Sequence, residues 1–82
     1  MELEIKAKLQ QMYEAELKEH PPLPPWLFIP GADRYDIAWR MGAGEDQIMK
    51  LAAYFMFCGP EALARYRAAY PEPKGWEGWY DE

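Results

Sequence analysis

Residues 39–57 read WRMGAGEDQIMKLAAYFMF and join a glycine-rich turn to the most apolar segment of the chain. The last ten residues of this stretch contain one charged side chain, Lys50. A helix that is apolar on nearly all sides is expected to be buried on most of them. The length, the Ala, Leu and Met content, and the acidic Glu45 and Asp46 at the start favour a helix over a buried strand. We therefore predict a central helix over about residues 45–58.

Two glycines, Gly42 and Gly44, directly precede this helix. Backbone N–H groups at a helix N-terminus can bind an anion, but the acidic residues that follow would repel it. We therefore favour a chain reversal in which glycine adopts a positive φ, and we expect Arg40 to pair with Glu45 or Asp46 across it. The alternative is an anion or ligand site, whose residues would be Arg34, Arg40, Gly42 and Gly44.

Residues 1–19 are predicted to form an N-terminal helix. Apolar residues recur there at spacings of about three and four, which gives one apolar stripe, made of Ile5, Leu9, Met12, Tyr13 and Leu17. We expect this helix to pack on its own domain. The alternative is that it binds a partner or forms a homodimer, because the stripe is narrow and a proline-rich segment follows.

Residues 20–30 contain four prolines in five positions, from Pro21 to Pro25. Proline ends a helix and favours an extended conformation. We therefore predict a polyproline-like strut that crosses the core and delivers an apolar run into it, namely Trp26, Leu27, Phe28 and Ile29.

Residues 31–82 are predicted to form the core, in which a short helical turn, capped by Asp33 or Asp36, comes before the central helix. A further helix is expected over residues 60–70. The tail that follows is too aromatic for a disordered terminus, so we favour a tail that folds back onto the helices; an exposed recognition patch is the alternative. The prediction is an all-α fold: one domain over residues 1–82, with three helices, a polyproline strut and an aromatic C-terminal tail.

The composition excludes several kinds of chemistry. The net charge is −5 and no basic stripe exists, so we expect no nucleic-acid partner. The chain has no Ser, Thr or Asn and only one Cys and one His, which removes hydroxyl nucleophiles and a zinc site within one chain. We therefore predict no enzyme, no metal and no cofactor. The apolar run is too short to span a bilayer and MELEIKAKL lacks a signal-peptide pattern, so we expect a cytoplasmic protein without a membrane partner.

Two fragments resemble features of small uncharacterised bacterial and phage proteins. The first is W-R-M-G-x-G-E at residues 39–45, and the second is Y-P-x-P-x-x-W-x-x-W-Y at residues 70–80. A P-P-W lead-in at residues 24–26 is similar as well, so the resemblance covers roughly residues 24–82. It implies a shared architecture and a shared surface, and it implies no particular activity.

A protein-interaction role is the leading hypothesis. The small size, the surplus of Trp and Tyr and the acidic charge suit an inhibitor or adaptor of the antidote or phage counter-defence type, which binds a partner protein through aromatic anchors. The expected contact residues are Trp39, Arg40, Trp76, Trp79 and Tyr80.

Two alternatives remain open. One is a protein that sequesters a small molecule such as a nucleotide, through stacking on tryptophan and an arginine on the phosphate. The other is a structural component of a mobile-element or phage assembly.

Overall fold

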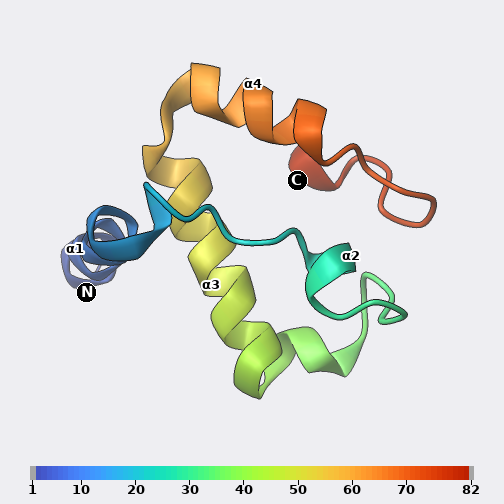
Figure 1. The fold of residues 1–82 in the computed structure, drawn as a ribbon. Helices are drawn as coiled ribbons and strands as arrows, with labels where there is room; N and C mark the ends of the chain where they lie inside the picture. The colour runs from blue at the N-terminus through green and yellow to red at the C-terminus, as the bar shows by residue number, and fades with distance from the viewer. Residues whose placement is uncertain (1, 82) are drawn as a thin grey trace.

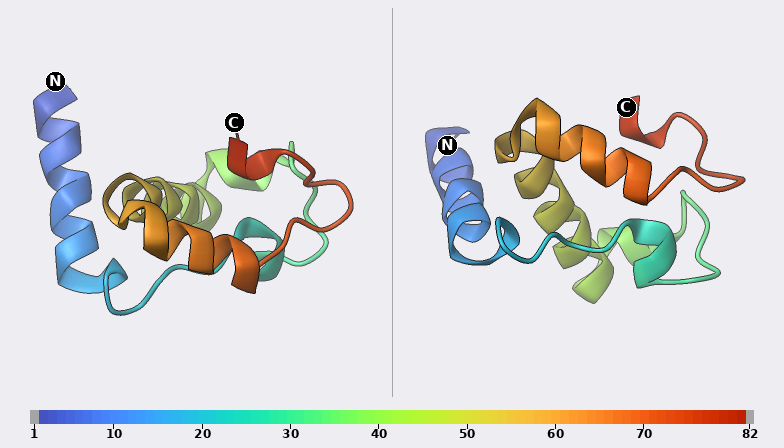
Figure 2. Two further views of the ribbon diagram at one scale, coloured as in Figure 1. Left: turned by 90° about the horizontal axis from the view of Figure 1, so that it is seen from above. Right: turned by 45° about the horizontal axis from the view of Figure 1, so that its top comes forward.

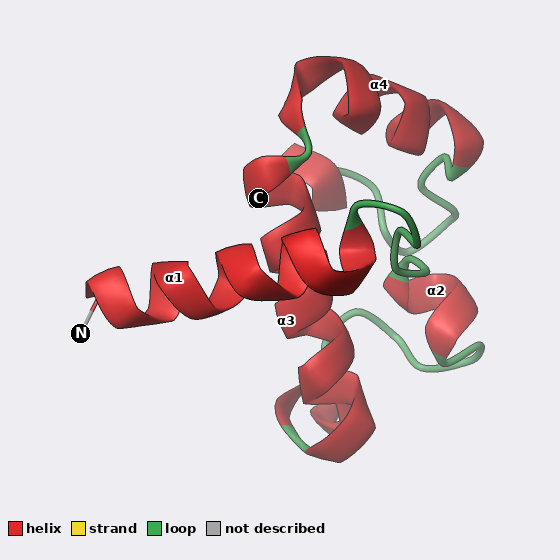
Figure 3. Ribbon diagram, turned by 60° about the vertical axis from the view of Figure 1, so that its left-hand side comes forward, coloured by secondary structure: helices red, strands yellow, loops and turns green. Residues whose placement is uncertain are grey.

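A computed structural model describes residues 2–81, and every regular element in that range is helical (Figure 3). Helix α3, Gly42–Phe57, runs through the middle of the molecule. Helix α1, Glu2–Met12, crosses it on one side, and helix α4, Gly59–Ala69, lies across its C-terminal end (Figure 1). The short helix α2, Pro25–Phe28, lies on the side of α3 away from α1. The all-α prediction is confirmed for this range.

Helix α3 buries one main stripe of side chains. Gln47, Leu51 and Tyr54 are spaced by four and three residues and are buried together. In the apolar run 48–58 the exposed residues are Met49, Ala52 and Met56, which share one face, and the others are buried or half-buried, so the expectation of burial on most sides is confirmed. The predicted start at residue 45 is three residues late, since the glycines form the first turn of the helix and do not precede it.

Helix α1 continues directly into a π-helix, η1, Tyr13–Leu17. Its wider turn is marked by the N–H of Lys18, which donates to the carbonyl of Tyr13 at 2.9 Å. In an α-helix, residues spaced by four move gradually around the helix axis, because four residues make more than one turn. A π-helical turn contains more residues and so rotates less per residue, which reduces this displacement. As a result Leu17 joins Leu9 in the same core cluster. Ile5, at the far end of the expected stripe, stays exposed.

The proline-rich segment between η1 and α2 is held by side chains from two helices. The hydroxyl of Tyr66 donates to the carbonyl of Pro22 at 2.6 Å, and the amide of Gln47 donates to the carbonyl of Leu23 at 2.8 Å. Because proline supplies no N–H, such a segment cannot satisfy its own carbonyls as a helix would. Buried side chains from α3 and α4 therefore provide the donors.

Helix α2 departs from the predicted strut, which was expected to stay extended to residue 30. Pro25 is at the first helical position, where proline is tolerated because that N–H has no helical partner. Leu27 is exposed, so the expectation that the whole apolar run enters the core is wrong for this residue. The prediction of three helices therefore missed one short helix.

The 3₁₀-helix η2, Ile37–Arg40, packs directly on the first turn of α3. It begins as expected at Asp36, whose carboxylate accepts the N–H of Ala38 at 2.9 Å. A Cβ atom on Gly44 would overlap the carbonyl oxygen of Ala38, so the two backbones can meet only at a glycine. The positive φ that the sequence suggested occurs at Gly42, where φ is +56°.

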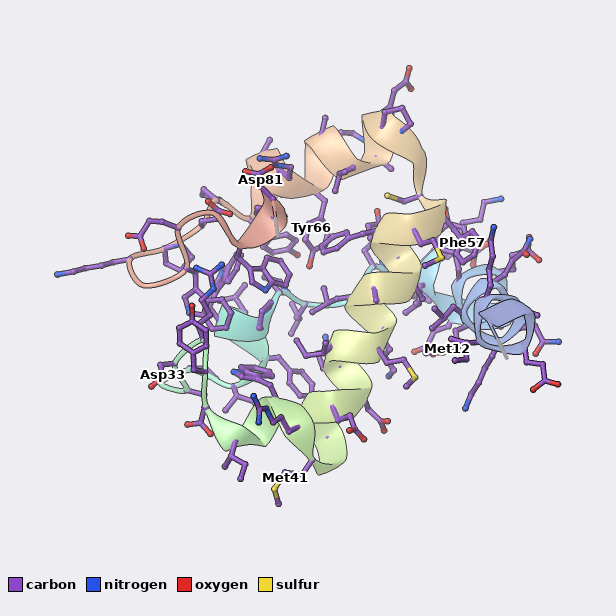
Figure 4. All side chains as sticks on the ribbon, turned by 180° about the vertical axis from the view of Figure 1, so that it is seen from behind. Met12, Asp33, Met41, Phe57, Tyr66 and Asp81 are labelled. Atoms are coloured by element: carbon purple, nitrogen blue, oxygen red, sulfur yellow. The ribbon has the colours of Figure 1, made fainter. Side chains whose placement is uncertain are left out.

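Helix α4 lies within one residue of its predicted range and begins at Gly59, where φ is +86°. Tyr66 is its buried residue and points from α4 toward α3 (Figure 4). The chain then passes through a loop to a last 3₁₀-helix, η3, Trp79–Asp81, beside α4 (Figure 2). Trp79 and Tyr80 pack against the core cluster.

The contact at Gly44 predicts that replacing this glycine by alanine destabilises the protein, whereas the same change usually stabilises an exposed helix. In an exposed helix, Gly→Ala stabilises by about 0.5–1 kcal/mol, but here the added methyl group would push η2 away from α3. We expect Gly44→Ala to lower the free energy of unfolding by about 2 kcal/mol or more, as overpacking does. Urea denaturation measures the change, and exposed Ala43→Gly serves as the control, with a loss of about 1 kcal/mol or less. A stabilised Gly44→Ala protein would contradict the contact.

Candidate protein-binding surface

Three large exposed apolar side chains lie within the seven residues around η2. Tyr35, Ile37 and Met41 are 84%, 68% and 59% exposed, and Arg40 between them is exposed as well. We call these four residues the η2 patch. Single exposed apolar residues are normal, but three in one short segment around an arginine are typical of an interaction site.

The geometry of η2 aims part of this patch in one direction. In a 3₁₀-helix, residues i and i+3 lie one above the other, so Ile37 and Arg40 share a face. The side chain of Met41 points away from the body of the molecule (Figure 4). Among the side chains that the structure describes, Arg40 forms no ion pair, so the expected pairing with Glu45 or Asp46 is absent.

Trp39 connects the η2 patch to the preceding turn and to the tail. Its indole N–H donates to the carbonyl of Asp33 at 2.8 Å. The ring is half-buried and meets Trp76 edge to face, with 6.0 Å between centroids and 83° between planes. The carboxylate of Asp33 accepts the N–H of Tyr35 at 2.8 Å and so tightens the preceding turn. Trp39, expected as a contact residue, is therefore half-buried and bonded to the turn that precedes Tyr35.

The other expected contact residues lie in a cluster of aromatic rings between α2, α3 and the tail. Trp76 is only 6% exposed and packs against Trp26, with ring centroids 5.5 Å apart. Trp79 and Tyr80 are half-buried and both contact Phe55 of α3. Of the five residues expected to contact a partner, Arg40 alone is exposed, and the other four are buried or half-buried.

Side-chain hydrogen bonds close the tail around this cluster. The carboxylate of Glu72 accepts the N–H of Tyr80 at 2.8 Å and the N–H of Gly78 at 3.0 Å. These two donors lower the pKa of Glu72 below its usual value. The hydroxyl of Tyr80 donates to the carbonyl of Tyr70 at 2.6 Å, while burial and the nearby Glu72 carboxylate raise the pKa of Tyr80 to about 12. The guanidinium of Arg67 covers the ring of Tyr80 at 5.2 Å.

Three residues of the alternative anion site lie together at the junction of η2 and α3, and the fourth lies apart. Gly44 is buried against Ala38, and Gly42 and Arg40 lie at the start of α3 and in η2. Arg34 lines a cavity between α2 and the tail, which none of the other three residues lines. Arg34 therefore lies apart from the other three residues, which stay together where η2 meets α3.

The described residues offer little for catalysis. Burial raises the pKa of the Cys58 thiol, which disfavours the thiolate that a nucleophile requires. Between residues 2 and 81, His, Cys, Asp and Glu side chains form no group of three that could hold a metal ion. Within the same range, no helix is long and apolar enough to cross a membrane.

Comparison with known proteins gave no match to a family, a curated protein or a solved structure. The resemblance to small bacterial and phage proteins therefore stays a prediction. The η2 patch must be interpreted from its own chemistry.

Sequence reasoning singled out Trp39 and Arg40 but missed Tyr35, Ile37 and Met41. The sequence did contain a signal of their exposure. The segment that carries these three large apolar residues is too short to form an amphipathic helix that could bury all of them on one face. Their exposure follows from the way η2 sits on α3, which no local pattern specifies.

The Glu72 hydrogen bonds predict a pH dependence of stability. The pKa of Glu72 is lower in the folded chain than in the unfolded chain, so its contribution is present above the unfolded pKa of about 4.3 and is lost as pH falls through the folded pKa. We expect Glu72→Gln to be less stable than the wild type at pH 7, with a difference that shrinks below about pH 4.

Thermal unfolding between pH 7 and pH 3 tests this, with exposed Glu19→Gln as the control, which should stay close to the wild type throughout. A difference between Glu72→Gln and the wild type that does not change with pH would contradict the role of the carboxylate.

Proposed function

We propose that this chain is a small protein-interaction module, an inhibitor or adaptor that acts in the cytoplasm and binds a partner protein through the η2 patch. The observation that carries the proposal is the exposed Arg40 with exposed Tyr35, Ile37 and Met41 around it. Arginine and tyrosine are enriched among the residues that dominate binding energy. Apolar side chains around an arginine also help a partner to exclude water from it, and the ion pair or hydrogen bond that the arginine then forms is stronger in the lower dielectric.

The rigid support of the η2 patch favours binding. The Gly44 contact, the Asp36 cap and the Trp39 hydrogen bond hold η2 in one conformation. A segment that is already ordered loses less conformational entropy when a partner docks. Because less free energy is lost in ordering the η2 patch, more of its contact energy contributes to the affinity for a partner.

The charges define the kind of partner. Arg40 requires a carboxylate, with which a guanidinium forms two parallel hydrogen bonds. The apolar side chains around it require an apolar groove beside that carboxylate. The net charge of −5 favours a partner with a basic surface outside the contact, because opposite fields speed encounter. We infer a basic partner protein that carries an acidic residue within an apolar groove.

Two parts of the fold are assigned structural roles that support this surface. We infer that the proline-rich segment is a strut, because hydrogen bonds from Gln47 and Tyr66 tie it between α3 and α4. We infer that the aromatic tail closes the core, because Trp76 is buried and Tyr80 bonds back to the end of α4. Both roles leave the side chains of the η2 patch exposed.

Charge reversal in the η2 patch tests the proposal. Arg40→Glu should weaken partner binding by about tenfold or more, which corresponds to the loss of one dominant contact, and Ile37→Ala should weaken it by a similar factor. Partners are captured on the wild-type chain from extracts of cells that encode it, identified by mass spectrometry, and titrated by calorimetry.

The matched control is Lys18→Glu, which makes the same charge change on an exposed residue after η1 and should leave the affinity within about twofold. Urea denaturation must show that all variants fold. Equal affinity of Arg40→Glu and Lys18→Glu for the captured partner would refute the proposed surface.

A further inference from the structure

An apolar groove of about 310 Å³ lies between α1 and the C-terminal half of α3. It is lined by Ile5, Lys6 and Leu9 of α1 and by Met56 of α3. Leu9 is buried, whereas Ile5 and Met56 are 59% and 53% exposed. The helix η2 packs on the opposite end of α3, at its first turn, so the groove and the η2 patch share no residue.

The groove forms where α1 extends past α3, as Figures 2 and 3 show for the N-terminal half of α1. Leu9 belongs to the core cluster, and Met12 and Tyr13 pack against it. Ile5 lies one turn before Leu9 on the same apolar stripe but stays exposed. The stripe of α1 therefore continues from the core onto the surface, where another helix can pack on it.

A side chain that fits this groove lies on the same helix as the groove. When two copies of α1 pack antiparallel, Ile5 of each copy can enter between Ile5 and Leu9 of the other, next to Met56. A two-fold axis relates the two contacts, and this is the commonest symmetry of protein dimers. Helices in coiled coils pack in the same way, with a side chain of one in the space between residues of the other. A second copy of this chain therefore supplies both parts of the contact.

The charges of α1 match this arrangement. If Ile5 of one copy lies between Ile5 and Leu9 of the other, it is level with residue 7, and Glu4 of each copy is then level with Lys8 of the other. Residues four apart share one flank of a helix, and antiparallel pairing brings the same flanks of the two helices together. Glu4 and Lys8 are exposed, and among the side chains that the structure describes neither forms an ion pair.

Two repulsive effects keep the association weak. Lys6 lies on the other flank and meets Lys6 of the second copy near the two-fold axis, and each chain carries a net charge of −5. Salt screens such charges beyond about 8 Å at 0.15 M, and a lysine can extend its ammonium into water while its stem covers apolar surface. A contact through half of one helix is also smaller than the usual interface of about 1,600 Å².

We propose that two copies of this chain form a weak dimer through the N-terminal halves of their α1 helices. Ile5 of each copy fills the groove of the other, and Glu4 pairs with Lys8 across the contact. The contact lies at the end of α3 away from η2, so this proposal and that of the η2 patch can fail separately.

Sedimentation equilibrium of the full chain in 0.15 M salt tests the dimer between about 10 µM and about 1 mM. We expect a concentration-dependent dimer with a Kd of about 0.1 mM. Ile5→Ala should weaken it about tenfold, because both copies lose the side chain that fills the groove. The matched control is Gln10→Ala, which changes an exposed residue about 100° around the helix from Leu9 and should leave the Kd within about twofold. Urea denaturation checks that the variants fold.

A charge swap tests the register of the two helices. Glu4→Lys and Lys8→Glu should each weaken the dimer, because like charges then face each other at both positions. In a mixture of the two variants opposite charges face each other, so the mixed dimer should be at least about fivefold tighter than the dimer of either variant. Net charge alone would place the mixed dimer between the other two, since one variant is less acidic than the wild type and the other more acidic.

Three results would overturn the proposal. The first is a monomer at all concentrations up to about 1 mM. The second is a dimer that Ile5→Ala leaves as tight as the wild type, which would place the contact elsewhere on the chain. The third is a mixed dimer of Glu4→Lys and Lys8→Glu that is no tighter than the dimers of the single variants.

Discussion

The structure depends on one close approach between two backbones, where the first turn of α3 meets the carbonyl of Ala38. The absence of a side chain at Gly44 is what permits it. The contact fixes η2 on α3, and η2 in turn directs Trp39 toward Trp76 in the tail. The glycine at position 44 therefore fixes the exposed patch on the central helix and, through Trp39, links both to the aromatic cluster of the distant tail.

Within residues 2–81 of this 82-residue chain, the structure achieves this order with four α-helices. So small a domain buries only about 60% of the surface of its unfolded chain, and large rings compensate because each of them buries much area. The ring cluster and the hydrogen bonds of Tyr66 and Glu72 hold segments that have no helical hydrogen bonds of their own. The tryptophans of this chain pack on other rings inside the fold, whereas Tyr35, Ile37 and Met41 near Arg40 stay exposed.

Local sequence patterns predicted the long helices closely, but they did not specify how the segments between the helices pack. The apolar run to Phe57 and the proline and glycine at its end placed α3 and α4 closely, because both signals act within a few residues. The proline run suggested an extended strut, yet Pro25 begins α2, since a proline suits a first helical turn as well as a strut. Gly44 suggested a turn, but its role is a tertiary contact. The aromatic tail was compatible with a tail folded onto the helices and with an exposed recognition patch. The two can be distinguished only by the residues against which its rings pack, such as Trp26 and Phe55.

Site-specific photo-crosslinking in cells that encode the chain tests the central claim, that the η2 patch is a protein-binding surface. A benzophenone amino acid would replace Tyr35, which is 84% exposed, or, as a control, exposed Gln10 on α1. The account predicts one discrete crosslinked product from position 35 and none from position 10. No product from position 35, or the same products from both positions, would contradict it.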